Sequence, residues 1–315
     1  MCVVYLILIF WALTTIYPIL WVILNSFKDR KKIIANSFAL PLGDLFSMEN
    51  YKTAFDRLNI FTAYKNSIIV SCCVAVVVIL LAGMASYALV RYNLKTKKLL
   101  NTMVVAAMMF PVFATIIPVF RMEFSWGIVN TDKVSLSLLS LILPQIAGNL
   151  AFAMVVLTGY IRSLPIELEE SAYLEGCNPM QIFFKIVVPL TKPSFATVGI
   201  FSFLWSYNDL FSQTFFLRFK DQWAITRLLM EISSREGTDY GLMAAVVTLI
   251  IVPLLVVYVC LQKYIIKGMT AGAVKGCVPE IKIKKTDGNG SACLNCYDRR
   301  KVFGGKAARY FPFFR

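Results

Sequence analysis

Hydrophobic residues along this chain gather in long runs instead of the spaced patterns of amphipathic elements. Six runs approach the ~20 residues that an α-helix needs to cross a bilayer. Because lipid offers the backbone no hydrogen-bond partners, runs of this length indicate helices and not barrel strands. The pattern predicts an all-α, polytopic membrane protein with six transmembrane helices. The runs are Val3–Leu24, Ser67–Val90, Leu99–Phe120, Val134–Thr158, Ser194–Leu217 and Tyr240–Ile266.

The composition agrees with this class of protein and argues against several functions. Of 315 residues, 58% are hydrophobic and 16% are charged, against about 25% charged in soluble domains. The net charge of +14 is scattered over several loops, which fits loops facing anionic lipid better than a nucleic-acid site. The absence of histidine removes imidazole catalysis and most zinc sites. The pair Cys293 and Cys296 has too few ligands for a metal, so we predict neither a catalytic nor a metal site.

The short loop Arg91–Lys98 carries four basic residues and no acid, so the positive-inside rule places it in the cytoplasm. With six spans, both termini and the segment Ser163–Pro193 are then cytoplasmic too. One cluster disagrees: Lys28–Lys32 is basic, yet alternation places it outside. We follow the even count of spans and the short loop.

The segment Ser163–Pro193, referred to below as the polar loop, separates the fourth and fifth runs. Its first part predicts a short helix that Gly176 ends in a left-handed conformation. Asn178 then predicts the N-cap of a second helix, with Gln181 completing a capping box and Pro189 ending the helix. The polar loop is therefore predicted to be a cytoplasmic helix–turn–helix.

Acidic residues crowd the first helix of the polar loop. A hairpin that only anchors the loop in the membrane is the alternative to a binding surface, but such anchors are usually lysine-rich on their polar face. Anionic lipid would repel carboxylates, so the acids favour a protein partner. They are Glu167, Glu169, Glu170 and Glu175.

The polar loop resembles the signature loop of bacterial ABC importer permeases, E-A-A-x-x-x-G followed after nine residues by I-x-L-P. Serine replaces the first alanine here, and valine replaces the leucine. Segments such as TTIYPILWVILNSFK, ASYALVRYNLK, WSYNDLF and GTDYGLMAAVVT resemble the carbohydrate-importer branch, of the maltose-permease kind. The matching loop residues are Glu170, Ser171, Ala172, Gly176, Ile186 and Pro189.

The resemblance implies a permease subunit of an ATP-driven, binding-protein-dependent carbohydrate importer in the bacterial cell membrane. It leaves open which sugar is carried, and a glycerol-phosphate or similar polyol ligand is the alternative. The expected partners are a second homologous permease, two cytoplasmic ABC ATPase subunits, an extracytoplasmic solute-binding protein and the lipid bilayer. The ATPase subunits would bind ATP and Mg, since this chain has no G-x4-G-K-[ST] phosphate loop; no cofactor is expected in the chain itself.

The resemblance also implies that the first helix of the polar loop docks on an ATPase subunit. The central docking positions would be Glu170, Ala172 and Gly176, and the surrounding acids Glu167, Glu169 and Glu175. The resemblance ends near Gly276, so residues 1–276 are predicted to form the permease domain. Residues 277–315 are predicted to be a disordered tail without a role in transport, or alternatively a regulatory tail that binds the ATPase or lipid.

Polar residues within the fifth run are candidates for the substrate pathway. Trp205 offers an aromatic face, and Asn208 and Asp209 offer amide and carboxylate groups that suit sugar hydroxyls. An ionisable group in a span is a pathway candidate by default. The alternative is that Asp209 lies near the outer end of the span, or at a helix break, and is simply hydrated.

Two other functions compete with an ATP-driven importer. An ion-gradient-coupled secondary transporter is disfavoured because few carboxylates, Glu123 and Asp209 among them, lie in or next to the first five runs. A membrane scaffold without transport is disfavoured by the prolines that punctuate the runs, which suit a bent bundle around a pathway.

Overall fold

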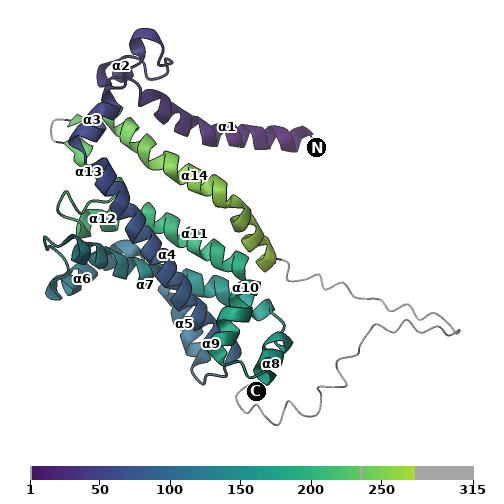
Figure 1. The fold of residues 1–315 in the computed structure, drawn as a ribbon. Helices are drawn as coiled ribbons and strands as arrows, with labels where there is room; N and C mark the ends of the chain where they lie inside the picture. The colour runs from purple at the N-terminus through teal and green to yellow at the C-terminus, as the bar shows by residue number, and fades with distance from the viewer. Residues whose placement is uncertain (1, 235–236, 274–315) are drawn as a thin grey trace.

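The computed structural model describes residues 2–234 and 237–273, and this part of the chain is almost entirely helical (Figure 1). The longest helices are α1 (Cys2–Asn25), α4 (Ile60–Arg91), α7 (Val134–Ser163), α11 (Lys192–Tyr207) and α14 (Tyr240–Ala273). The predicted all-α class is confirmed. Residues 277–315 lie outside the described residues, as do Cys293 and Cys296.

Short segments connect the long helices. Those before α7 are α2 (Arg30–Ala35), η1 (Gly43–Leu45), α3 (Glu49–Arg57), α5 (Lys97–Ala107) and α6 (Val112–Ser125). Those after α7 are α8 (Glu167–Leu174), α9 (Pro179–Ile182), the π-helical η2 (Phe183–Val187), α10 (Val188–Leu190), α12 (Leu210–Phe216), η3 (Ile225–Arg227) and α13 (Leu228–Ile232). Two-residue strands, β1 (Ser233–Ser234) and β2 (Gly237–Thr238), pair antiparallel.

Four helices of the described part are long and apolar enough to cross a bilayer, namely α1, α4, α7 and α14. A fifth span results if the helical segment Pro179–Leu190 and α11, which meet at a bend of 83°, are counted together. The predicted six spans, and the side of the membrane on which the polar loop lies, stay predictions.

The third and fifth predicted spans are each divided between two helices. In the third, α5 ends at Ala107 and α6 begins at Val112. Pro111 explains this break, because proline has no N–H to donate and restricts the residue before it to extended conformations. In the fifth, α11 ends at Tyr207 and Asp209 caps the start of α12. Both breaks lie beside the cavity described below.

The centre of the bundle is α4, which packs along α7 and α11. Helix α14 lies between α1 and α11 (Figure 1). No residue of the apolar stretch of α1 is buried, as expected for a helix that faces lipid. Figure 1 places α8 and α9 at one end of the bundle, with α2 and α3 at the other.

The loop after α1 explains the basic cluster that disagreed with the predicted topology. Lys28 is fully buried, and its ammonium group donates to Asn25 Oδ1 and to the Ser37 carbonyl, each at 3.2 Å. Lys32 pairs with Asp29 at 3.2 Å. Two basic side chains of the cluster therefore bind partners within the loop itself. The cluster is thus weak evidence for the side of the membrane on which this loop lies.

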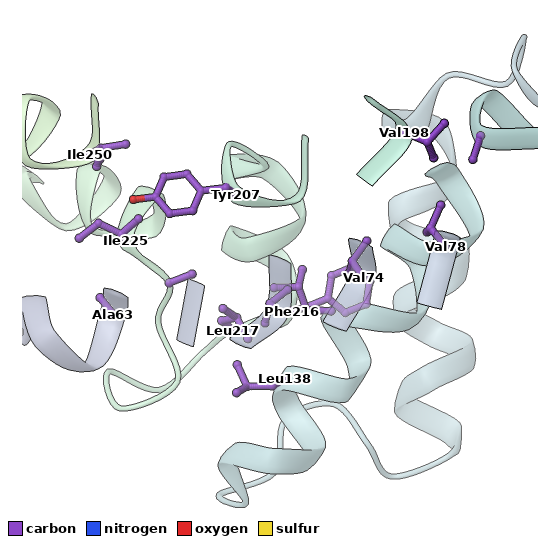
Figure 2. Packing of buried hydrophobic residues seen from close by; sticks show 14 of the residues in the cluster. Ala63, Val74, Val78, Leu138, Val198, Tyr207, Phe216, Leu217, Ile225 and Ile250 are labelled. Atoms are coloured by element: carbon purple, nitrogen blue, oxygen red, sulfur yellow. The ribbon is translucent and has the colours of Figure 1, made fainter. Parts of the chain in front are cut away.

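The C-terminal end of α12 is anchored in the core. Phe216 and Leu217 are almost fully buried and lie near Val74 of α4 and Leu138 of α7 (Figure 2). This anchor holds α12 against the bundle although the helix is interrupted between α11 and α12.

Close packing of α4 against α11 depends on glycine. A Cβ atom at Gly83 would lie 2.6 Å from Phe195 Cε1 and 3.2 Å from Phe183 Cζ. Gly83 and Ser86 lie three residues apart on α4, and both are buried. The Ser86 hydroxyl also donates to the Met154 carbonyl at 3.2 Å, which joins α4 to α7.

Gly83→Ala is expected to destabilise the protein by about 1–3 kcal/mol, because the added methyl group must displace an aromatic ring in a packed interface. Thermal unfolding of the purified protein measures the change. Gly159→Ala in α7 is the matched control: a Cβ atom there would meet nothing within 4 Å, so the helix-favouring methyl group should be neutral or stabilising. Equal stability of the two variants would contradict the close approach of α4 and α11.

Candidate functional site

The turn of the polar loop has the geometry that the sequence predicts. Gly176 has a φ of +86°, in the left-handed region that favours glycine. The Cys177 N–H donates to the Ala172 carbonyl at 3.1 Å, and the Gly176 N–H donates to the Tyr173 carbonyl at 3.0 Å. These two bonds form a Schellman motif, so the end of α8 is determined by local sequence.

The second helix of the polar loop also begins as predicted. The Gln181 N–H donates to Asn178 Oδ1 at 2.8 Å, and the Asn178 N–H donates to Gln181 Oε1 at 2.9 Å, which completes the capping box. The prediction that Pro189 ends this helix is wrong, since helical structure continues through α10 to Leu190. The π-helical turn η2 ends just before the proline, and such turns accommodate a local interruption of the α-helical bonding pattern.

One face of α8 is turned toward the chain's own bundle. Glu169 and Ala172, three residues apart, are buried. Arg91, at the end of α4, places its Nη2 2.6 Å and its Nε 2.7 Å from Glu169 Oε1. The same guanidinium donates to the Leu164 carbonyl at 3.1 Å. A buried, hydrogen-bonded ion pair therefore ties the polar loop to α4.

The other face of α8 points outward. Glu167, Glu170, Ser171 and Glu175 are exposed. Large apolar side chains accompany them: Leu168 is 45%, Tyr173 44% and Leu174 64% exposed. Sequence reasoning found the acids but missed these apolar neighbours. It also grouped Glu169 and Ala172 with the docking residues, whereas the structure places both on the inward face. The three-residue spacing of Glu169 and Ala172, which places both on one face of a helix, was the signal in the sequence for this inward face.

The remaining motif residues of the polar loop support its shape. Gly176 and Pro189 are exposed, while Ile186 is half-buried and packs against the core. Ile182, Phe183 and Val187 are buried, so the second helix packs against the bundle through an apolar side. The polar loop therefore presents one exposed helix, α8, on a second helix that is embedded in the bundle.

A cavity of about 920 Å³ lies at the two helix breaks, lined by α6, α7, α12 and the end of α11. Trp205 and Asp209 line it, but Asn208 does not. Asn208 is exposed and donates to the Leu204 carbonyl at 2.9 Å. Of the three predicted pathway residues, the structure brings two together.

Asp209 is held by hydrogen bonds on both carboxylate oxygens. Gln145 Nε2 donates to its Oδ2 at 2.9 Å, and the Ser212 N–H donates to its Oδ1 at 3.0 Å. Ser206 Oγ lies 2.5 Å from Gln145 Oε1, to which it donates. Asp209 therefore lies at a helix break, as one interpretation of the sequence expected, and also lines the cavity, as the other expected.

Two buried acceptors in the cavity wall were missed. Glu123 is 1% exposed, and its Oε2 has no hydrogen-bond partner among the described residues. Asn149 is 7% exposed; its amide nitrogen donates to the Gln145 carbonyl at 2.7 Å, which leaves its Oδ1 without a partner in the described part of the chain. Two amide residues spaced by four, Gln145 and Asn149, within an apolar run were the signal for this face.

The fold and these two sites define a helical membrane transport protein. Residues 55–271 match the family described as binding-protein-dependent transport system inner membrane component. This match spans more than half of the chain, and the chain belongs to that family. The resemblance inferred from the sequence is thereby confirmed.

Individual relatives agree. The diacetylchitobiose uptake system permease protein of Streptomyces coelicolor is 32% identical over 270 residues, covering 85% of this chain and 87% of the relative. The melibiose/raffinose/stachyose import permease protein of Bacillus subtilis is 28% identical, covering 81% and 90%. A chain in a crystal structure of a bacterial ABC transporter involved in alginate import has a TM-score of 0.71 and 21% identity, covering 84% and 95%. This last likeness shows the fold.

Arg91→Ala is expected to weaken transport and loosen the polar loop, because it leaves the Glu169 carboxylate buried without its counter-ion, at a cost of about 3–5 kcal/mol. Uptake into reconstituted vesicles and protease sensitivity of the loop measure the two effects. The exchanged pair Arg91→Glu with Glu169→Arg should recover part of the loss.

Arg162→Ala is the control, since Arg162 is exposed near the same loop. Wild-type uptake and loop protection in Arg91→Ala would contradict the role of the ion pair.

Proposed function

We propose that the chain is one of two permease subunits of an ATP-driven, binding-protein-dependent carbohydrate importer, with six spans and both termini in the cytoplasm. The observation that carries the proposal is the exposed acidic and apolar face of α8, held at one end of a helical membrane bundle. The relatives' substrates support a sugar: their names give diacetylchitobiose and melibiose, raffinose and stachyose.

The exposed face of α8 has the chemistry of a docking surface. Leu174 and Leu168 would fill apolar pockets on an ATPase subunit, and burial of such anchors supplies most of the binding energy in protein interfaces. The surrounding Glu167, Glu170 and Glu175 would form charge-assisted contacts with basic residues of that partner. A solved bacterial alginate ABC transporter in complex with a periplasmic protein that binds an alginate pentasaccharide supports an assembly with further subunits.

Movement of the docked helix would reach the cavity through the bundle. The Arg91–Glu169 pair joins α8 to α4, and α4 packs on α7 and α11, which carry Gln145 and Trp205 of the cavity wall. Closure of two ATPase subunits on ATP would therefore shift the polar loop, α4 and the cavity wall together. ATP and Mg would be bound by those subunits and not by this chain.

The cavity would form this chain's half of the substrate route. Aromatic faces such as Trp205 suit the apolar faces of sugar rings. Amide and carboxylate oxygens accept hydrogen bonds from hydroxyl groups. The cavity is open enough for such a ligand, at about 920 Å³, in the range of known ligand sites.

Leu174→Asp is expected to lower ATP-dependent uptake roughly tenfold or more while leaving membrane insertion intact, the effect of losing an interface anchor worth about 2 kcal/mol. The measurement is uptake of radiolabelled sugar into proteoliposomes that contain all subunits, together with co-purification of the ATPase.

Leu94→Asp is the matched control, since Leu94 is a partly exposed leucine in the neighbouring basic loop. Normal assembly and uptake in Leu174→Asp would contradict docking through α8. Uptake that needs an ion gradient and no ATP would contradict the proposed energy source.

A further inference from the structure

The ionisable residues of the cavity wall are all acidic. Among the residues that line the cavity, Glu123 and Asp209 are acidic, and none is lysine, arginine or histidine. Arg121 belongs to the same helix as Glu123 but is exposed and is not part of the lining. A ligand in this cavity therefore meets carboxyl groups and no counter-ion from the described part of this chain.

Two buried hydrogen-bonding groups of the wall are acceptors without partners among the described residues. The oxygens Glu123 Oε2 and Asn149 Oδ1 are buried and have no partner among the described residues. The orientation of the Asn149 amide follows from its nitrogen, which donates to the Gln145 carbonyl. Unsatisfied buried acceptors are costly in a folded protein, and a ligand hydroxyl that donates to them removes this cost.

Apart from Thr115, Gln145, Ser206 and Ser212, the rest of the wall is apolar and aromatic. Phe113 and Phe211 meet edge to face with ring centroids 4.7 Å apart. Trp126 and Trp205, both exposed in this chain, also line the cavity. Such a wall contacts sugar rings but does not replace the hydration of an anionic group, and desolvation of an unpaired charge is strongly unfavourable.

We propose that this chain's wall of the cavity selects for uncharged, hydroxyl-rich oligosaccharides and disfavours anionic ones such as uronides and sugar phosphates. This inference rests on the proposed function and specifies its substrate class. Glu123 and Asn149 accept hydrogen bonds from ligand hydroxyls. Asp209, fixed by Gln145 and the Ser212 N–H, supplies negative charge to the same space. The solved relative with this fold belongs to an importer of an acidic polysaccharide, so the fold alone does not determine the charge that is accepted.

The test measures the charge preference of the cavity without relying on the unidentified substrate. The complete transporter is reconstituted with its native cysteines replaced by serine and with Ala147→Cys, a position that is exposed and lines the cavity. Its rate of modification is compared for a cationic and an anionic methanethiosulfonate reagent. Ser163→Cys, an exposed site at the far end of the same helix, corrects for the intrinsic reactivities.

The corrected ratio at position 147 is expected to favour the cationic reagent roughly tenfold, as for one to two carboxylates acting at short range. Asp209→Asn should narrow this preference severalfold, and the same vesicles should take up a neutral disaccharide faster than its uronic-acid counterpart. A ratio near one, or faster modification by the anionic reagent, overturns the inference. ATP-dependent sugar uptake in those vesicles is measured separately. Absence of this uptake contradicts the proposed function, whereas the ratio of modification rates tests only the charge selection.

Discussion

The ion pair between Arg91 and Glu169 joins the polar loop to α4, the helix at the centre of the bundle. Both side chains are withdrawn from water, and the guanidinium also binds the Leu164 carbonyl, so the loop is held at two points. Without it, the buried Ala172 and the connections to α7 and α9 would be the main links between α8 and the bundle. With it, a charged contact links α8 directly to α4.

The cavity lies where two helical segments of the bundle are interrupted. Pro111 separates α5 from α6, and the Asn208–Asp209 step separates α11 from α12. Irregular backbone is stable only where protein or water satisfies its polar groups. Asp209 satisfies the first turn of α12, Gln145 satisfies Asp209, and Phe216 and Leu217 anchor the far end of the helix. The same residues that repair the break thus form the polar wall.

Much of the polar loop was predictable because its determinants are local. Gly176 and the box of Asn178 and Gln181 act over a few residues, and their geometry follows from glycine's conformational freedom and from unpaired backbone groups at helix ends. The faces of α8 were less predictable. Glu169 and Glu170 are neighbours in sequence and chemically identical, yet Glu169 meets Arg91, 78 positions earlier, and Glu170 faces outward. The cavity residues Glu123 and Asn149 were missed because they lie on different helices, α6 and α7. Only the tertiary structure shows that both helices line one cavity.

The sequence alone determined that this is a helical membrane protein, where its polar loop turns, and which family it belongs to, since runs of apolar residues, capping groups and motif spacing act through solvent and local backbone. Tertiary structure decided which carboxylates are free and which are paired, because desolvation and Coulomb attraction depend on distances between segments far apart in the chain. It also decided that the cavity wall, as far as the described residues form it, carries two carboxyl groups and two unpaired acceptors but no lysine or arginine. That property belongs to no single segment and exists only where α6, α7 and α12 meet.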